Sequence, residues 1–285
     1  MDAKKSLGQN FLQDKQVIEK IISAIAPCEG ELIVEIGPGE GVLTEQLIHA
    51  GAIVVAIELD DRLIPILKEK FKNYSNAFIV HQDILKTDIG KIFSELNLNT
   101  VLCEKSVENE KKKNLQSSKG TFRMIGNLPY YITSPIIRKF LEMKQSPREM
   151  FFMIQKEVAE RICAPLGEMS ILSVAVQYYA RPEIQFFVSK EAFEPVPKVE
   201  SAFVLIKKEC EKNNENTDLF FRVVRTGFSA RRKTLANNIV NGFPIKKEMM
   251  ENFLLQIDLK EKVRAQDLSV NDWKKITNFL KENYI

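Results

Sequence analysis

The segment Ile125-Gly-Asn-Leu-Pro-Tyr130 has the residue types needed to bind an amino group on the edge of a nucleic-acid base. The side-chain oxygen of Asn127 and the backbone carbonyl of Leu128 can both accept hydrogen bonds from such an amine. Two such bonds would draw its nitrogen towards a tetrahedral, more nucleophilic geometry, in line with a methyl donor. Pro129 would fix the turn, and Tyr130 could stack on the base. By itself this short pattern more often marks a plain turn.

A glycine-rich segment, Glu35-Ile-Gly-Pro-Gly-Glu-Gly41, lies between a predicted strand and a predicted helix. Such a loop lets the backbone at Gly37 and Gly39 approach a ligand closely, and it points the N-terminus of a helix at that ligand. A dinucleotide fingerprint would have a further glycine where Val42 stands. The segment therefore favours S-adenosylmethionine over NAD, and a tight turn without a ligand is the alternative.

Two carboxylates follow the next two predicted strands, Glu58 after 52–57 and Asp83 after 77–80. Because the carboxyl ends of parallel strands meet at one edge of a sheet, both are expected beside the glycine loop. Glu58 could accept hydrogen bonds from ribose hydroxyls. Asp83 could accept from an adenine amino group, with Ile84 packed on the ring. A solvated strand end for Glu58 and a helix N-cap for Asp83 are the alternatives.

The segments that position these residues alternate between strand and helix patterns over the first two thirds of the chain. This alternation predicts an α/β fold with a parallel sheet covered on both faces. After Lys207 the strand pattern stops, and three or four short amphipathic helices follow. Strands are expected at 31–36, 52–57, 77–80, 122–125, 150–154, 184–188 and 201–206, and helices at 14–26, 44–50, 62–71, 135–141, 157–161 and 170–179. Asp14 is expected to be the N-cap of the first helix.

Length and composition predict two domains in a reduced compartment. A chain of 285 residues with 45% hydrophobic residues can build one large core and one smaller core. The polar stretch 208–216 predicts the boundary, with one domain at 1–207 and a helical domain at 208–285. The segment 97–121 is too polar to pack, so we expect a mobile surface insertion there. The four cysteines form no C-x-x-C pair, which argues against a structural zinc site or a disulfide framework.

Charge is unevenly distributed, although the net charge is only +3. The stretch 219–247 has basic residues interleaved with phenylalanines and no acidic residue. Its apolar residues could anchor helices to a core while its cations face phosphate, and a merely solvated helical face is the alternative. No export signal or membrane span is expected, because no run of about 18 apolar residues occurs. The cations of this basic stretch are Arg222, Arg225, Arg231, Arg232, Lys233, Lys246 and Lys247.

Taken together, these motifs resemble those of the small-subunit ribosomal RNA adenine dimethyltransferases, the KsgA/RsmA family, over nearly the whole chain. The resemblance implies a Rossmann-like class I S-adenosylmethionine-dependent methyltransferase domain and a smaller all-helical C-terminal domain that binds rRNA. The matching segments are Ser6-Leu-Gly-Gln-Asn-Phe-Leu12, Val34-Glu-Ile-Gly-Pro-Gly-Glu-Gly41, Ile57-Glu-Leu-Asp60, Gln82-Asp-Ile84, Gly126-Asn-Leu-Pro-Tyr130, Met153-Ile-Gln-Lys-Glu157, Phe193-Glu-Pro-Val-Pro-Lys-Val-Glu-Ser-Ala202 and Phe228-Ser-Ala-Arg-Arg-Lys-Thr234.

The resemblance also implies a substrate and a reaction. Four methyl groups would pass from S-adenosylmethionine to two adjacent adenosines in the 3′-terminal hairpin loop of 16S rRNA, leaving S-adenosylhomocysteine and needing no metal. The partner would be the immature small ribosomal subunit in the cytoplasm, with a role in ribosome biogenesis, and we expect a monomer because this partner is large. By the resemblance Phe193 would hold a flipped adenine against Tyr130, whereas its residue type alone predicts a core position. By the family pattern the cofactor contacts are Asn10, Leu12, Gly37, Glu58, Asp83 and Asn127.

Two features depart from the family pattern, namely the insertion at 97–121 and Tyr131, which stands where an asparagine is common. Other functions stay open beside the first. They are a large-subunit rRNA adenine methylase of the macrolide-resistance type (23S rRNA), a DNA adenine methylase, and a binding factor that checks ribosome assembly. The Asn-Leu-Pro-Tyr form and the segment 228–234 favour the small-subunit enzyme.

Overall fold

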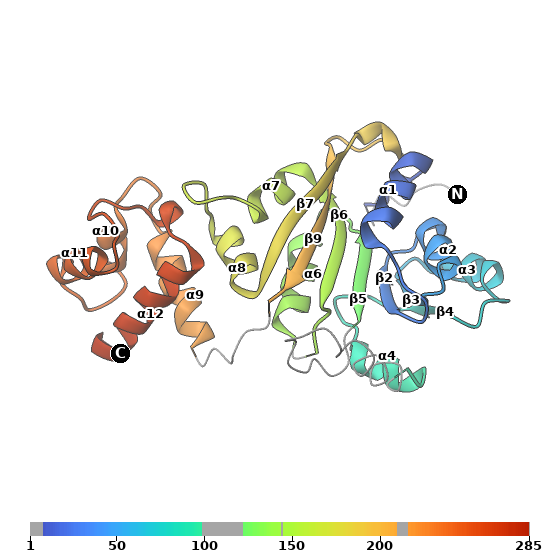
Figure 1. The fold of residues 1–285 in the computed structure, drawn as a ribbon, viewed down its shortest axis with the longest axis horizontal. Coiled ribbons are helices and arrows are strands. Elements are labelled where there is room, and N and C mark those ends of the chain that lie inside the picture. Colours follow the sequence, from blue (N-terminus) through green and yellow to red (C-terminus); the bar gives the residue numbers. More distant parts are fainter. Residues whose placement is uncertain (1–7, 99–121, 144, 210–215, 285) are drawn as a thin grey trace. The chain divides into compact units, whose positions relative to one another are not determined.

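The computed structural model describes residues 8–98, 122–143, 145–209 and 216–284 (Figure 1). The chain divides into two compact units, the first of residues 1–159 and 183–208, the second of residues 160–182 and 209–285. The boundary expected near Lys208 coincides with the end of the first unit. However, residues 160–182 belong to the second unit and not, as the sequence had predicted, to the first; that prediction was wrong. Most of the predicted insertion at 97–121 lies outside the described residues.

The first unit contains a seven-stranded sheet in the order β4-β3-β2-β5-β6-β9-β7. The strands from β4 to β6 pair in parallel, and β9 pairs antiparallel with β6. The strands predicted from the sequence are all present with bounds shifted by a few residues, but their pattern did not indicate the antiparallel pairing. The strands are β2 (Leu32–Ile36), β3 (Ile53–Glu58), β4 (Ala77–His81), β5 (Arg123–Asn127), β6 (Glu149–Gln155), β7 (Ala180–Val188) and β9 (Ser201–Lys208).

The order of the strands reverses beside β2. From β2 the chain steps outward to β3 and β4, and it then returns to the other side of β2 with β5. In wound sheets, ligands bind outside the carboxyl ends of the strands at such a reversal. Gly37 follows β2, Glu58 ends β3, Asp83 lies just after β4, and Asn127 ends β5. The topology therefore brings the strand-end residues predicted from the sequence to one edge of the sheet.

Helices cover both faces of the sheet. Those on one face, α1 (Lys15–Ile25), α2 (Val42–His49) and α3 (Leu63–Lys70), share a core with strand residues such as Ile33. The neighbouring Val34 points to the opposite face and is also fully buried. Right-handed crossovers place α4 (Ile89–Glu95) and α6 (Thr133–Glu142) on that second face. The short α4, which has Gly90 inside it, was not predicted.

Local sequence explains where the first helix starts. Asp14 is the N-cap of α1, and its carboxylate accepts hydrogen bonds from the backbone N–H groups of Gln16 and Val17. Ile18, Ile21 and Ile25 then recur at helical spacing and are buried against the sheet. The predicted helix and its cap are therefore confirmed. Among the described residues, no helix has the length and apolar character required to cross a membrane.

The second unit is helical and has its own hydrophobic core around the fully buried Trp273. Tyr178 of α8 packs against Phe220 of α9, with 4.2 Å between the ring centroids. This packing gives a physical reason why residues 160–182 belong to the second unit. The helices are α8 (Ile171–Tyr179), α9 (Thr217–Gly227), α10 (Leu235–Ile239), α11 (Lys247–Gln256) and α12 (Val270–Tyr284), and α7 (Lys156–Ile162) ends in this unit.

Candidate functional site

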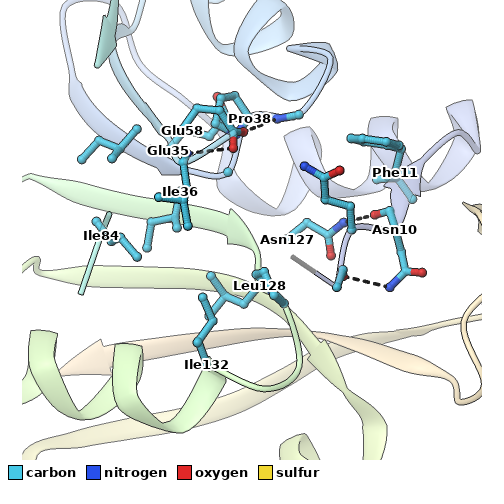
Figure 2. A pocket seen from close by; sticks show the side chains of 18 of the residues that line it. Asn10, Phe11, Glu35, Ile36, Pro38, Glu58, Ile84, Asn127, Leu128 and Ile132 are labelled. Atoms are coloured by element: carbon cyan, nitrogen blue, oxygen red, sulfur yellow. Dashed lines mark hydrogen bonds between the residues drawn. The ribbon is translucent and has the colours of Figure 1, made fainter. Parts of the chain in front are cut away.

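A pocket lies at the carboxyl edge of the sheet, where the strand order reverses (Figure 2). It is lined by residues from the ends of β2 to β5 and by the N-terminal segment 8–12. The residues predicted to contact the cofactor all line this pocket, and so do Leu128, Pro129 and Tyr130. The cofactor residues are Asn10, Leu12, Gly37, Gly39, Glu58, Asp83, Ile84 and Asn127.

The glycine loop joins β2 to α2 in a conformation that larger residues would strain. Gly37, Gly39 and Gly41 have φ angles of 65°, 60° and 76°, in the left-handed region. A Cβ atom on Gly41 would lie only 2.7 Å from the ring of Phe71. At Gly37, by contrast, a Cβ would meet nothing within 4 Å, so this part of the backbone is open to a ligand. The loop fits a ligand that approaches the main chain closely.

Glu58 forms one wall of the pocket and is 5% exposed. Its Oε1 accepts from the N–H groups of Leu59 and Asp60, both at 2.8 Å, and its Oε2 accepts from that of Gly39 at 3.3 Å. A carboxylate has about four acceptor positions, so Oε2 has room for a ligand hydroxyl. Burial raises the pKa of Glu58, and the three backbone hydrogen bonds oppose that rise. A solvated strand end, the alternative for Glu58, is therefore wrong.

Asp83 lies in the turn between β4 and α4. Its Oδ1 accepts from the N–H of Leu85 at 2.9 Å. The helix N-cap alternative is wrong, because Asp88 caps α4 by accepting from the N–H of Lys91. Ile84, which is 6% exposed, lines the pocket beside Asp83. The pair provides an acceptor and an apolar surface, which suit the amino edge and the face of a heterocyclic ring.

Asn127 connects the end of β5 to the N-terminal segment. Its Nδ2 donates to the backbone carbonyl of Asn10 at 2.8 Å, as the dashed line in Figure 2 shows. Because a carbonyl can only accept, this bond fixes the amide orientation and leaves Oδ1 as the acceptor for a ligand. The orientation that the amine-binding hypothesis requires is thus set by a contact across the pocket.

The N-terminal segment 8–12 is also held from two other directions. The strand β1 (Phe11–Leu12) pairs antiparallel with β8 (Phe193–Glu194). Gln9 donates through Nε2 to Oδ2 of the buried Asp60 at 2.9 Å. Since these contacts come from distant parts of the chain, only the tertiary fold places this segment at the pocket.

The residues after Asn127 form a turn that contains two consecutive aromatic residues, Tyr130 and Tyr131. Leu128 donates its N–H to the carbonyl of Met153 at 3.1 Å. The hydroxyl of Tyr130 lies 3.0 Å from Oγ of Ser201, which orients the Tyr130 ring. Tyr131 is 59% exposed and lines the pocket. The departure from the family pattern at Tyr131 therefore changes the pocket wall itself.

Phe193 is the one predicted catalytic residue that the structure does not bring to the pocket. It is 3% exposed and packs in the hydrophobic core with Leu12, its partner in the β1–β8 pair. In this structure it supports the N-terminal segment through its pairing with Leu12. Its stacking on a base stays a prediction, which would require the ring to leave the core.

Glu35 lines the pocket, although no role was predicted for it from the sequence. It is 2% exposed, and its Oε2 accepts from the hydroxyl of Thr44 at 2.5 Å. Burial raises the pKa of Glu35 from 4.5 to about 7; the nearby Glu58 adds to this rise, while the Thr44 hydrogen bond opposes it. The available signal was a single acidic residue within an otherwise apolar strand.

Glu35 should make the stability of the protein depend on pH. The folded state holds a proton that the unfolded chain releases above pH 4.5. Stability is therefore fully present below this value and is lost as the pH rises through about 7. Between pH 5 and 8 we expect the wild type to lose about 2.5 kcal/mol of unfolding free energy that Glu35→Gln does not lose. Urea unfolding at several pH values measures this difference.

The matched control for this measurement is Glu69→Gln, since Glu69 is an exposed residue of α3. Its dependence of stability on pH should follow that of the wild type. Equal slopes for the wild type and Glu35→Gln would contradict the raised pKa of Glu35.

In the second unit, the cations of the basic stretch 219–247 are exposed. Phe220 and Phe243 from the same stretch are buried in its core. The guanidinium of Arg222 lies over the ring of Phe243, 4.8 Å from its centroid. The predicted separation, with rings in the core and cations at the surface, is confirmed. Contact with RNA stays a prediction for Arg222, Arg225, Arg231, Arg232 and Lys233.

Two solved structures with the same fold are methyltransferases. The crystal structure of a dimethyladenosine transferase from Plasmodium falciparum matches with a TM-score of 0.75 and 25% identity, covering 95% of this chain and 98% of that one. The crystal structure of the 23S rRNA methyltransferase ErmE matches with a TM-score of 0.71 and 23% identity, covering 95% of this chain and all of that one. The wound sheet and the pocket at its reversal thus define a class I S-adenosylmethionine-dependent methyltransferase.

The family model for ribosomal RNA adenine dimethylase matches residues 1–282, and the chain belongs to this family. The ribosomal RNA small subunit methyltransferase A of Bacillus mycoides (strain KBAB4) is 40% identical over an alignment of 285 positions, which covers 97% of this chain and 91% of that protein. The protein of the same description from Dehalococcoides mccartyi (strain CBDB1) is 37% identical over 278 residues, 97% of this chain and 88% of that protein. The family resemblance and the fold class predicted from the sequence are confirmed.

Proposed function

We propose that this protein dimethylates two adjacent adenosines in the 3′-terminal hairpin loop of 16S rRNA, using S-adenosylmethionine and acting on the immature small ribosomal subunit. Support comes from the relatives described as small-subunit methyltransferases. The observation that carries the proposal is the fixed amide of Asn127, whose Oδ1 is the free acceptor in a pocket that also holds Glu58 and Asp83. Acceptor groups for an amine and for a nucleoside therefore occur in one cavity.

The donor would occupy the part of the pocket beside the glycine loop. Glu58 would accept from a ribose hydroxyl through Oε2, and Asp83 with Ile84 would hold the adenine. The open backbone at Gly37 leaves room for the rest of the donor. When bound, S-adenosylmethionine supplies a methyl group on a positively charged sulfur. The carboxylates of Glu58 and Asp83 favour a cationic ligand in this pocket.

The target amine would be held by Oδ1 of Asn127 and the carbonyl of Leu128. Two acceptors reduce the delocalisation of the nitrogen lone pair into the ring, so that it can attack. Tyr130, oriented by Ser201, would stack on the extruded base, and such stacking is worth roughly 1–3 kcal/mol per base. No strong base is required, because the nitrogen becomes acidic once it is cationic.

The same two acceptors offer a reason for product release. The free amine has two N–H donors, the monomethyl amine has one, and the dimethyl amine has none. Each transfer therefore removes one hydrogen bond to Asn127 or Leu128. A dimethylated base would leave both acceptors unpaired, and this loss favours its departure.

The test is methylation of small subunits that lack the modification, with labelled S-adenosylmethionine and mass spectrometry of the rRNA. We expect dimethyladenosine at two adjacent positions near the 3′ end of 16S rRNA. Methylation of large-subunit RNA or DNA, together with no incorporation into small subunits, would reject the proposal. Binding to small subunits without methyl transfer would favour the assembly-factor alternative.

We also propose that the protein acts in the cytoplasm as a monomer.

The basic stretch provides a separate prediction about RNA binding. Replacing both Arg231 and Arg232 by alanine removes two exposed cations. We expect weaker association with the small subunit and a logarithmic salt dependence whose slope is smaller by about 1.5. Affinity for S-adenosylhomocysteine should not change. Binding is measured at several salt concentrations.

The matched control replaces both Lys260 and Lys262 by alanine; these are two exposed cations of the second unit outside the basic stretch. This control should keep the affinity and salt slope of the wild type. If the arginine variant also keeps the wild-type slope, these arginines do not contact phosphate.

A further inference from the structure

The ammonium group of Lys139 on α6 binds the backbone of one loop that is distant in the sequence. Its Nζ donates to the carbonyl oxygens of Ile84 at 2.8 Å, Leu85 at 3.0 Å and Thr87 at 2.6 Å. An ammonium has three N–H donors, so these carbonyls account for all of them. Hydrogen bonds from a charged donor are stronger than neutral ones, so Lys139 fixes the course of residues 84–87.

The loop that Lys139 holds carries two residues of the pocket, Asp83 and Ile84. Asp83 closes this loop from within. Its carboxylate accepts from the N–H of Leu85 at 2.9 Å, and its carbonyl accepts from the N–H and the hydroxyl of Thr87 at 3.0 and 2.8 Å. The loop is therefore fixed by its own Asp83 and, from a neighbouring helix, by Lys139.

The helix that carries Lys139 starts directly behind the acceptor turn. The hydroxyl of Thr133, the first residue of α6, donates to the carbonyl of Pro129 at 3.3 Å. Lys139 follows about 9 Å further along the helix axis, at 1.5 Å per residue. A single rigid element thus connects the turn at 127–130 to the loop at 83–87.

The environment of Lys139 differs from that of a lysine that only solvates a surface. Burial lowers its pKa, and the carboxylates of Asp83 and Asp88 oppose that fall. The adjacent Arg138 has a side chain that is 77% exposed and pairs with Glu142 within the same helix. Lys139 instead gives up hydration and side-chain freedom in order to bind three carbonyls of another segment.

We propose that Lys139 is a positioning residue that sets both the affinity and the adenine selectivity of the donor pocket. The inference rests on the proposed function, which puts the donor's adenine against Asp83 and Ile84. Without the ammonium, three carbonyls lose their donor and the loop relaxes. The carboxylate of Asp83 then no longer stays where an adenine amino group donates to it.

The test compares S-adenosylhomocysteine with S-inosylhomocysteine, whose ring has an oxygen in place of the amino group. Isothermal titration calorimetry gives both affinities for the wild type, Lys139→Met and the control Arg138→Met. Lys139→Met should weaken S-adenosylhomocysteine about tenfold and bring the ratio of the two affinities close to one. Arg138→Met, which removes a cation from the same helix, should keep the ratio of the wild type.

If Lys139→Met keeps the wild-type ratio of the two affinities, the inference is overturned. This holds even if both affinities fall together, because a general loss of stability weakens the binding of both ligands alike. Lys139→Gln, which keeps N–H donors at this position, is measured in the same way and decides the question if Lys139→Met does not fold. Failure of the wild type to bind S-adenosylhomocysteine would instead overturn the proposed function and this inference with it.

Discussion

Replacement of Asn127 by alanine is expected to lower kcat for methyl transfer by about a thousandfold. Alanine removes Oδ1, the acceptor that would hold the target amine, and Nδ2, which donates to Asn10. Acceptors that act on the reacting atom mainly stabilise the transition state, so kcat should fall far more than the affinity for the donor. Single-turnover transfer to unmodified small subunits measures the chemical step, and calorimetry measures donor affinity.

The control for this variant is Asn73→Ala, an exposed asparagine in the first unit. It should transfer methyl groups at the wild-type rate. Thermal unfolding shows whether Asn127→Ala keeps the N-terminal segment in place, since that segment loses one of its contacts. A folded Asn127→Ala enzyme with less than about a tenfold loss of kcat would contradict the role proposed for the amide.

The second large effect is expected at the other end of the pocket, for Glu58→Gln. Glutamine keeps the size of the side chain. It replaces one carboxylate oxygen by an NH₂ group and the other by a neutral carbonyl oxygen, which is a weaker acceptor. With the NH₂ in place of Oε2, it would face the N–H of Gly39 as a second donor and could not accept from a ribose hydroxyl. We expect affinity for S-adenosylhomocysteine to fall about a hundredfold, the size of a lost hydrogen bond to a charged group.

Calorimetric titration of the variant measures this loss, and Glu69→Gln is the control with the same change at an exposed position. The control should bind like the wild type. If Glu58→Gln is folded and binds S-adenosylhomocysteine as tightly as the wild type, the ligand does not depend on this carboxylate, and the placement of the nucleoside in the pocket is wrong.

The strand-end residues could be predicted because their signals are local. A buried strand and the residue that ends it are adjacent in the chain, so Glu58 and Asn127 were found without any knowledge of distant contacts. The topology of parallel strands then requires such residues to meet at one edge. The helix start at Asp14 was equally local, because a cap acts on the next few N–H groups.

Features that depend on contacts between distant segments could not be predicted. The pKa of Glu35 depends on how completely the fold removes water from it. The residue type of Phe193 alone predicted a core position, but its pairing with Leu12 could not be predicted, because a strand of two residues has no periodic pattern. Residues 160–182 have the same helical pattern whichever unit they join, and their membership of the second unit follows from packing of Tyr178 on Phe220.

The sequence by itself therefore determined the kind of fold, the family and the residues that end the strands. These properties depend on short-range patterns, which every strand and helix carries in its own residues. Only the tertiary structure decided that the amide oxygen of Asn127, and not its NH₂ group, faces a ligand, that Glu35 is buried, and that Lys139 binds the loop beside Asp83. The burial of Glu35 depends on the removal of water by the fold. The contacts of Asn127 and Lys139 are hydrogen bonds between residues more than fifty positions apart in the sequence. Both kinds of interaction exist only once the chain has folded.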